Sequence, residues 1–376
     1  MKILILSCNT GEGHNSAAHA LCKEFTNYGD ECEIVDTLLF SGKRNTELVT
    51  NSFHSIIKRA PKVFGVAYQV SGIYSTTKLT SPIYYANAVY TKKLYKYISD
   101  KQFDIIICTH LFSMESMTYI RRKYRLNAKC YGVLTDYTCV PFLRETDIDG
   151  YFIPHKDIMI ECINRGMVAS KLFPTGIPVD SKFNNSINKQ ETKRYLNIPQ
   201  EQKMYLIMTG GLGFGKVAKL CKTLIKGNKD EALIYILVGK NKKLKDTIDN
   251  NYRFGNRVKT IEFTDKVNVY MSAADVLLSK PGGISSTEAA VVQVPLIHTL
   301  AIPGVETKNA RFFARKGMSI NARTIDEAAY DTNILANNPI ISEYIMKMQR
   351  KNINPNATND IVNKIKDLSN VDNNTK

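Results

Sequence analysis

Short apolar runs alternate with longer amphipathic segments along most of this chain, and this alternation restricts the fold more than any other feature. The first half has apolar runs at 2–8, 31–36, 103–109, 129–135, 150–153 and 170–175. The alternation restarts near residue 200, with apolar runs at 203–209, 232–238, 257–261, 275–279 and 295–298. Strands that alternate with helices form parallel sheets through right-handed crossovers. The sequence therefore predicts an α/β protein with two parallel sheets.

A turn-rich stretch at 174–183, followed by polar residues, separates the two series of strands. We expect a first domain at 1–178, a linker at 179–200 and a second domain at 201–339. A final helical piece at about 340–367 is expected to fold back over the first domain. Ligand sites of such domains lie at the carboxyl ends of the strands, so we expect a cleft shared by both domains.

The charge of the chain is strongly positive and unevenly distributed. Among 376 residues, 51 Lys and Arg stand against 35 Asp and Glu, which gives a formal net charge of +16. Residues 43–101 contain ten basic residues, two acidic residues and seven tyrosines. Basic helices with aromatic residues are typical of proteins that lie on anionic lipid. We therefore expect segment 45–101 to contact an anionic membrane, although ordinary surface helices would have the same composition.

The cysteines and the apolar runs indicate where the protein is found. Eight cysteines are scattered without a C-x-x-C pair, as expected for a reduced, cytosolic protein. The apolar run at the N-terminus is too short for a signal peptide, and no run approaches the roughly 18 apolar residues of a spanning helix. We expect a cytoplasmic protein that lies on the membrane rather than crossing it.

The loop after the first predicted strand reads Gly11-Glu12-Gly13-His14. It places an acid and an imidazole between a strand and an Ala-rich helical segment. A tight turn with a polar cap would explain it without any function. If the strand ends at the shared cleft, the same loop would line that cleft.

Two glycine-rich segments of the second half predict phosphate sites. Residues 209–215, TGGLGFG, connect a strand to a helix and imitate a P-loop, but Val217 stands where the Mg²⁺-binding hydroxyl is required. We therefore expect phosphate binding without a metal. In SKPGGISSTEA, residues 279–289, a strand leads through Pro-Gly-Gly to a helix N-terminus, a second anion site.

Glu288 falls in the first turn of that second helix. Its carboxylate could accept hydrogen bonds from two vicinal hydroxyls, or it could merely complement the helix dipole. Two phosphate-binding loops and a carboxylate together indicate a nucleoside diphosphate ligand.

Several blocks of the chain, taken together, resemble glycosyltransferase family 28. They are GEGHNSAAHAL, VLTDYT, TGIPV, TGGLGFG, SKPGGISSTEA and PGVETKNARFFARKG. They occur in the family's order from residue 1 to about 365. Within the family, the block after the first glycine loop is more similar to the diacylglycerol enzymes than to the peptidoglycan enzyme. The resemblance implies a GT-B fold, in which two Rossmann-like domains face a central cleft and the second holds a UDP-sugar.

The resemblance also implies roles for residues of the second domain. Glu288 would take the ribose hydroxyls, and the backbone near Phe263 would meet the uracil. Glu306 and Asn309 match positions that contact sugar hydroxyls. The diphosphate would be surrounded by Gly210, Gly211, Gly213, Gly283 and Ser285. Because some relatives carry Gln at position 306, the choice between glucose and galactose stays open.

Inverting transfer to an alcohol requires a base for the acceptor hydroxyl and stabilisation of the departing diphosphate. An imidazole is mostly neutral at cytosolic pH, and the matching His of the family supports His14 as this base. Asp136 is the rival base, or the partner that orients His14, or a capping residue of a turn. Gly11 and Gly13 would allow a close approach of the backbone to the acceptor.

We expect an enzyme that transfers a hexose from a UDP-sugar to 1,2-diacylglycerol at the inner face of the cell membrane, without a metal or cofactor. A UDP-sugar epimerase of the same fold and a lipid-linked peptidoglycan-precursor glycosyltransferase are the alternatives. A metal hydrolase could use His14, His110, Asp136 and His155, but their spacing is not that of a local metal site. A nucleic-acid-binding module would explain the charge, but no sequence signature of one is present, so we expect no nucleic-acid partner.

Overall fold

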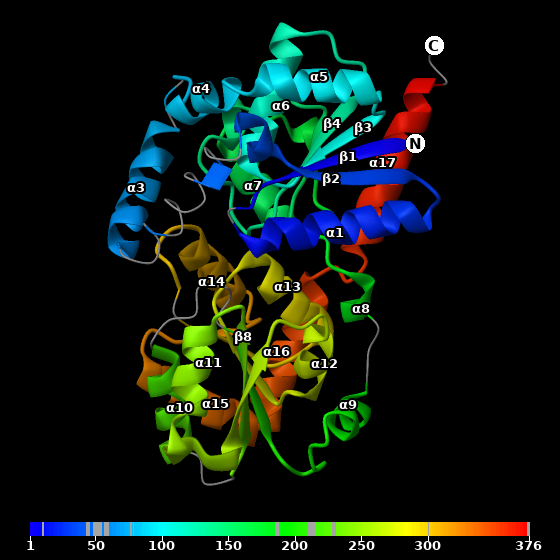
Figure 1. Ribbon diagram of the computed structural model, residues 1–376. Helices are drawn as coiled ribbons and strands as arrows, with labels where there is room; N and C mark the ends of the chain where they lie inside the picture. The colour runs from blue at the N-terminus through cyan, green and yellow to red at the C-terminus, as the bar shows by residue number, and fades with distance from the viewer. Residues whose placement is uncertain are drawn as a thin grey trace. The chain divides into compact units, whose positions relative to one another are not determined.

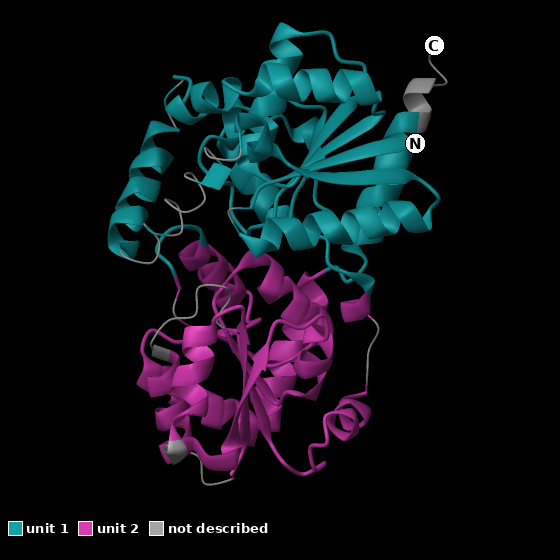
Figure 2. Ribbon diagram, in the orientation of Figure 1, with its two compact units in different colours: residues 1–181, 302–305, 354–376 teal, residues 182–301, 306–353 magenta. Residues whose placement is uncertain are grey.

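The computed structural model describes residues 1–9, 11–42, 46–47, 55, 60–75, 77, 79–184, 188–208, 216–227, 231–299 and 301–373. The chain divides into two compact units, drawn in different colours in Figure 2. Unit 1 contains Met1–Ser181, Ile302–Val305 and Asn354–Lys376. Unit 2 contains Lys182–Ala301 and Glu306–Ile353. No described helix is long and apolar enough to cross a membrane.

Unit 1 is built on a six-stranded, fully parallel sheet (Figure 1). Its strands, in chain order, are β1 Lys2–Ser7, β2 Glu31–Asp36, β3 Ile105–Cys108, β4 Lys129–Val133, β5 Gly150–Phe152 and β6 Leu172–Phe173. The order across the sheet is β2-β1-β3-β4-β5-β6. The strand order reverses between β1 and β3, which pair from Ile3 with Ile105 to Leu6 with Cys108.

Unit 1 also contains several helices. They are α1 Glu12–Asn27, α3 Pro61–Tyr74, α4 Pro82–Ala88, α5 Thr91–Lys101, α6 Leu111–Lys123, α7 Lys156–Asn164 and α17 Ala357–Asn373. Short 3-10 helices lie at Thr37–Ser41, Leu143–Glu145 and Ala169–Lys171. The core joins Ile3 and Ile5 of β1 to Phe25 of α1 and to Ile361 and Ile365 of α17. The C-terminal helix, red in Figure 1, therefore completes the core that the first strand begins.

Unit 2 repeats the architecture with a different strand order. Its strands are β7 Met204–Met208, β8 Leu233–Gly239, β9 Val258–Glu262, β10 Val276–Ser279, β11 Leu296–His298 and β12 Ile320–Asn321. They are all parallel, in the order β12-β11-β10-β7-β8-β9, which reverses between β7 and β10. The ends of these two strands pair at Met208 and Ser279.

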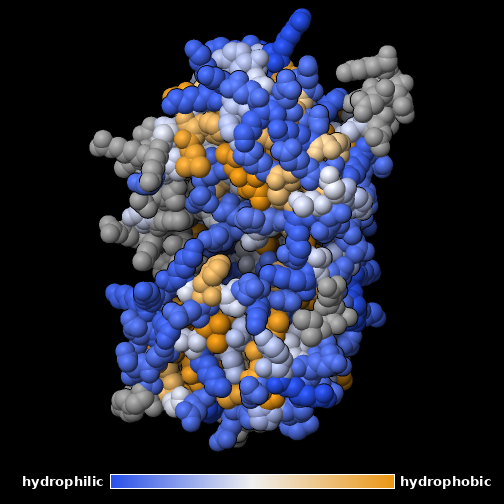
Figure 3. All heavy atoms as spheres, turned by 45° about the vertical axis from the view of Figure 1, so that its right-hand side comes forward, coloured by the Kyte–Doolittle hydropathy of each residue, from blue (hydrophilic) through white to orange (hydrophobic). Residues whose placement is uncertain are grey.

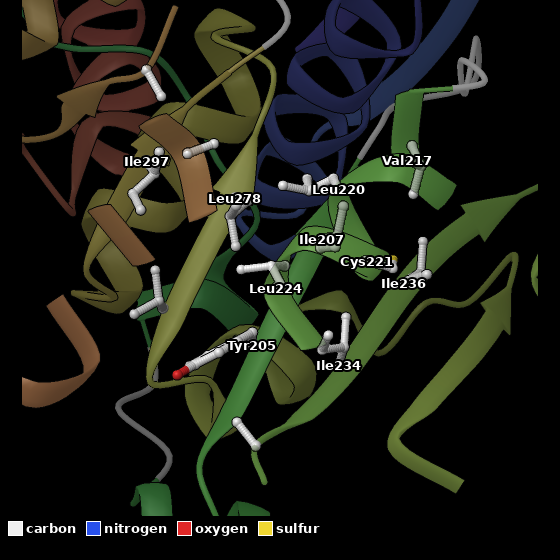
Figure 4. Packing of buried hydrophobic residues seen from close by; sticks show 14 of the residues in the cluster. Tyr205, Ile207, Val217, Leu220, Cys221, Leu224, Ile234, Ile236, Leu278 and Ile297 are labelled. Atoms are coloured by element: carbon white, nitrogen blue, oxygen red, sulfur yellow. The ribbon is translucent and has the colours of Figure 1, made fainter. Parts of the chain in front are cut away.

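The helices of unit 2 are α9 Lys189–Tyr195, α10 Lys216–Gly227, α11 Lys242–Asp249, α12 Val267–Ala273, α13 Gly283–Val292, α15 Ile325–Asn337 and α16 Pro339–Asn352. A 3-10 segment covers Tyr252–Arg257, and α14 Val305–Arg315 and the short α8 Ser181–Asn184 begin at unit boundaries. Figure 4 shows side chains of β7, β8, β10 and α10 gathered in the core. The fully buried Val217, Cys221 and Ile234 belong to it.

Two segments differ from the division expected from the sequence. Residues 189–195, within the expected linker 179–200, form α9, which packs on α12 in unit 2. The single piece expected at 340–367 is two helices, α16 in unit 2 and α17 in unit 1. Pro355 lies between them, and it lacks the N–H of a helix interior and disfavours helical backbone at the residue before it.

The tyrosines of segment 45–101 mostly pack within unit 1. Tyr84 and Tyr90 are buried, Tyr97 donates to the carboxylate of Glu33, and the ring of Tyr95 stacks on Tyr124. In the sequence, Val49, Phe53, Ile56 and Ile57 repeat at helical spacing, but these four residues lie outside the described residues. Most of the tyrosines of this segment therefore contribute to packing and hydrogen bonding within unit 1.

The outward face of α3 is apolar. Val63, Val66, Val70 and Ile73 are 63%, 60%, 59% and 72% exposed. On the other side of the helix, Gly65 and Tyr68 pack against Pro303 and Gly304, which belong to the same unit. The face drawn in Figure 3 is mostly hydrophilic. An apolar stripe along a whole helix is unusual on such a surface.

A carboxyl group is buried between α4 and α6. Glu115 is fully buried, Asn87 donates to it, and the charge of Glu145 lies nearby. Burial, aided by Glu145, raises the pKa of Glu115 to about 9. The native protein therefore holds a proton on Glu115 that the unfolded chain releases above the ordinary pKa of 4.5.

We expect Glu115→Gln to stabilise the protein increasingly as pH rises from about 4.5 to about 9. In wild type the stability contributed by the bound proton is complete below pH 4.5 and is lost towards pH 9, with a slope of at most about 1.4 kcal/mol per pH unit. The neutral amide has no proton to lose. Urea unfolding at several pH values measures the difference, with the exposed Glu201→Gln as control. A difference between Glu115→Gln and wild type that does not change with pH would contradict the assignment.

Candidate active site

The first group of candidate residues lies where the strand order of unit 1 reverses. His14 is in the first turn of α1, which follows β1, and Thr109 and His110 follow β3. The backbone N–H of Thr109 donates to the carbonyl of Leu6 at 3.0 Å, so the two strand ends are held together. Parallel α/β sheets bind ligands at this reversal, outside the carboxyl ends of the strands.

Two hydrogen-bonding groups hold Nδ1 of His14. The carbonyl oxygen of Thr109 and the hydroxyl oxygen of Thr135 each lie 2.9 Å from it. A carbonyl can only accept, so Nδ1 must carry a hydrogen. In the neutral ring, Nε2 then carries the lone pair. The structure thus assigns the tautomer that can accept a proton at Nε2.

The surroundings of His14 favour its neutral form. Burial lowers its pKa from the ordinary 6.5, while the negative charge of Asp136 and the hydrogen bond to Thr109 oppose that effect. The imidazole is therefore neutral at pH 7, as a general base must be. Asp136 lies just beyond β4, beside Thr135, and acts on His14 as a nearby charge. Thr135, which sequence reasoning did not single out, supplies the side chain that is hydrogen-bonded to Nδ1 of His14.

The glycines of the opening loop occupy ordinary backbone. Gly11 is the N-cap of α1 with φ −173° and ψ 141°, an extended conformation that any residue adopts. A Cβ placed there would have Cδ2 of His14 as its nearest neighbour, at 4.0 Å. Gly13 lies in the first turn of α1. The structure therefore places both glycines beside His14, without a conformation that requires glycine at position 11.

The second group lies at the corresponding place in unit 2. β10 ends at Ser279, and α13 begins at Gly283 with no side chain capping its first turn. The backbone N–H groups of that turn and the helix dipole favour an anion. Gly283 is the buried first residue of the helix. Glu288 lies in the second turn of α13, not in the first turn expected from the sequence. Ser285 and Glu288 are three residues apart and partly exposed, so they share one face of the helix.

Ser286 and Thr287, which follow Ser285, have structural roles. Ser286 is within 2.9 Å of Nε2 of the buried His298, and the hydroxyl of Thr287 donates to the carbonyl of Gly283 at 2.7 Å. Of the three adjacent hydroxyl residues, only Ser285 is partly exposed. The serine and carboxylate named from the sequence are thus on the outward side of the helix.

Glu306 and Asn309 connect α14 to the loop before α13. Lys280 forms an ion pair with Glu306 at 2.8 Å, and the amide of Asn309 donates to the carbonyl of Pro281 at 3.0 Å. Asn309 is fully buried, whereas the side chain of Glu306 is 18% exposed. Lys280, which sequence reasoning did not single out, therefore positions Glu306.

The remaining expected residues lie at other strand ends or outside the described chain. Phe263 directly follows β9, is 70% exposed, and has the ammonium of Lys240 at 5.2 Å from its ring centre. Gly210, Gly211 and Gly213 lie outside the described residues, between the end of β7 and the start of α10. Among the residues that the structure describes, no three His, Cys, Asp or Glu side chains form a group able to hold a metal.

Family models match both halves of the chain. Residues 14–179 match the model for monogalactosyldiacylglycerol synthase, and residues 205–370 match that for the C-terminal domain of glycosyltransferase family 28. Between them the two matches cover most of the sequence. The chain belongs to glycosyltransferase family 28.

Curated relatives of this glycosyltransferase extend over nearly its whole length. A processive diacylglycerol beta-glucosyltransferase from Bacillus licheniformis is 28% identical over 368 residues, covering 96% of this chain and 93% of the relative. The enzyme of the same name from Bacillus subtilis is 28% identical, covering 94% and 90%. The protein is accordingly a UDP-sugar-dependent glycosyltransferase, as expected from the sequence.

Solved structures share the fold of this glycosyltransferase. MurG of Acinetobacter baumannii superposes with a TM-score of 0.65 at 15% identity, over 97% of this chain and 99% of that one. A UDP complex of MnaA from S. aureus gives a TM-score of 0.64 at 14% identity, over 98% and 97%. The GT-B fold expected from the sequence is thereby confirmed. At these identities the similarity extends to the fold alone.

His298 fixes the N-terminal half of α13 in this glycosyltransferase. Its Nε2 meets Ser286 of α13 and its Nδ1 lies 3.1 Å from the hydroxyl of Ser319, while the side chain is fully buried. Burial lowers the pKa of His298 to about 3. The ring is neutral in the native protein, and the unfolded chain would protonate it below about 6.5.

We expect the stability lost by His298→Gln to be largest at pH 7 and to shrink as pH falls from about 6.5 towards 3. At pH 7 the variant loses buried hydrogen bonds worth roughly 1–3 kcal/mol. Below the pKa of histidine in the unfolded chain, wild type loses stability because its unfolded form takes up a proton that the native form does not. Glutamine takes up no proton, so the variant does not lose this stability. Urea unfolding across this range measures the effect, and the exposed His19→Gln should follow wild type. A stability difference that is independent of pH would refute the prediction.

Proposed function

We propose that the enzyme transfers a hexose from a UDP-sugar to the free hydroxyl of 1,2-diacylglycerol, with inversion, to form a β-glycosyl diacylglycerol. The observation that carries this proposal is the histidine held at Nδ1 with its lone pair on Nε2. It lies within the half of the chain that matches the monogalactosyldiacylglycerol synthase model. The names of the full-length relatives support diacylglycerol as acceptor and glucose as the hexose to test first.

In the proposed reaction, Nε2 of His14 takes the proton of the acceptor hydroxyl as its oxygen attacks C1 of the hexose. The bond between C1 and the diphosphate oxygen breaks, and UDP leaves with the bonding electrons. A single displacement of this kind inverts the configuration at C1. The imidazolium formed on His14 is stabilised by the charge of Asp136, so Asp136 assists the base rather than replacing it.

Unit 2 would hold the donor. The uncapped first turn of α13 would accept the diphosphate, and Glu288 on its outward face would accept hydrogen bonds from the ribose hydroxyls. The departing negative charge would be stabilised by backbone N–H groups and the helix dipole, so we propose that no metal is required. The remaining donor contacts that we propose are Gly210, Gly211, Gly213, Gly283, Ser285, the backbone near Phe263, Glu306 and Asn309.

The acceptor is an insoluble lipid, so the enzyme must work at a bilayer. We propose that it lies on the inner face of the cell membrane, with the apolar stripe of α3 entering the lipid boundary. The stripe of Val63, Val66, Val70 and Ile73 supports this, because its side chains face away from unit 1. The basic residues of segment 45–101 would add attraction to anionic lipid.

Turnover of diacylglycerol in anionic vesicles tests the catalytic proposal. We expect glycolipid from UDP-glucose or UDP-galactose in the presence of a chelator, and loss of turnover in His14→Ala with UDP affinity nearly unchanged. Glu288→Ala should instead weaken UDP binding. In wild type, kcat/KM should fall as pH drops through the lowered pKa of His14, below 6.5, because the base becomes protonated.

The outcomes of this assay separate the alternatives. Conversion of the UDP-sugar without lipid would identify an epimerase, and transfer only to a lipid-linked peptidoglycan precursor would identify that activity. If His14→Ala keeps full turnover, His14 is not the base and Asp136 becomes the candidate.

Vesicle binding tests the membrane proposal. The double variant Val66→Glu and Val70→Glu should sediment less with anionic vesicles, because it places two carboxylates where apolar side chains would enter the lipid. Ile340→Glu, at an exposed apolar position of α16 in unit 2, serves as the matched control and should bind as wild type does. Binding should also weaken with salt. Equal binding of the double variant and wild type would exclude α3 as the docking element.

A further inference from the structure

A second histidine packs directly on His14. The ring centres of His14 and His110 are 4.6 Å apart and their planes meet at 84°, an edge-to-face contact. His14 comes from the first turn of α1, whereas His110 lies between β3 and α6. The two rings are brought together because β1 and β3 are neighbours in the sheet.

The position of the His110 ring is itself fixed. His110 is the N-cap of α6, and its Nδ1 accepts a hydrogen bond from the backbone N–H of Phe112 at 3.1 Å. Its ring also meets the ring of Phe112 edge-on, with centres 4.6 Å apart. The lone pair of Nδ1 is used by this cap, so the neutral ring carries its hydrogen on Nε2. His110 is therefore a rigid neighbour of His14 rather than a second base.

We propose that His110 is a positioning residue for the base. Thr109 and Thr135 hold the Nδ1 edge of His14, and the capped ring of His110 limits rotation of the imidazole about its Cβ–Cγ bond. Nε2 then keeps one direction, towards the acceptor hydroxyl. This inference rests on the proposed function of His14, and it assigns to His110 a role that acts through His14.

A helix cap alone does not require a histidine at position 110, because Asn, Asp and Ser are better N-caps.

A second histidine of unit 1 caps a helix in the same way. At α7, Nδ1 of His155 accepts a hydrogen bond from the backbone N–H of Asp157 at 3.1 Å. His155 follows β5, which is separated from β1 by two strands. The chain thus offers a capping histidine in the same unit but at a different part of the sheet.

Two substitutions of His110 separate the ring contact from the cap. His110→Phe keeps an aromatic ring against His14 but removes the acceptor for Phe112 N–H. His110→Asn keeps an acceptor for the cap but removes the ring. If the ring positions His14, His110→Asn should lower kcat by about tenfold to a hundredfold with little change in the KM for the UDP-sugar. His110→Phe should retain most of the turnover while its melting temperature falls.

The experiment measures kcat, KM for the UDP-sugar and melting temperature for wild type, both His110 variants, and the matched variants His155→Phe and His155→Asn. The His155 variants should keep wild-type kcat. Equal turnover of His110→Asn and wild type would overturn the inference. So would equal losses in folded His110→Phe and His110→Asn, or a loss in His155→Asn as large as in His110→Asn.

Failure of this inference is distinguishable from failure of the proposed function. If diacylglycerol is not the acceptor, wild type itself produces no glycolipid. If only the inference fails, wild type is active and His14→Ala is inactive, while the His110 and His155 variants give one of the overturning results named above.

Discussion

The constraint on which both units depend is that all their strands run in the same direction. Each strand must return to the start of the next through a crossover, so every carboxyl end reaches one edge of its sheet. Chain segments that follow different strands then meet at that edge, above all where the strand order reverses. In unit 1 the reversal joins the segments after β1 and β3, and in unit 2 those after β7 and β10.

A single hydrogen-bonding arrangement defines the chemistry of the reversal in unit 1. The carbonyl of Thr109 requires a hydrogen on Nδ1 of His14, and that requirement leaves the lone pair on Nε2. Partial burial favours the neutral ring, and the charge of Asp136 favours the protonated ring that the proposed proton transfer would form. These opposing influences are what a proton-accepting group needs, because it must be neutral before the transfer and stable after it.

In unit 2 the reversal provides a helix N-terminus rather than a base. Around it, buried polar contacts hold the elements in place: Ser286 to His298, Asn309 to the backbone of Pro281, and Lys280 to Glu306. These contacts leave Ser285 and Glu288 on the outward face of α13. The different roles that we propose for the two units follow from what stands after the strands, a histidine in unit 1 and an uncapped glycine turn in unit 2.

Much of the fold could be predicted because its signals are local. The apolar runs became strands with nearly the expected bounds, and Gly-rich turns were followed by helices. The helix α15 was not anticipated, although Thr324 and Glu327 form a capping pattern there, with Thr324 accepting from the backbone of Glu327 at 3.1 Å. The break at Pro355, which sends α17 back to unit 1, also had a local signal that the helical pattern on either side concealed.

By itself, the sequence determined the α/β class, the two series of strands, and the candidates that stand at strand ends, since periodicity and turn residues act over a few positions. Only the tertiary structure decided which of these residues meet. Thr109, His110 and Thr135 reach His14 across about a hundred residues of chain, through a strand order that no local pattern encodes. Likewise, only packing against His298 distinguishes the buried Ser286 from the outward Ser285. Long-range strand pairing and side-chain burial are collective properties of the folded chain, and that is why they could not be predicted from short segments.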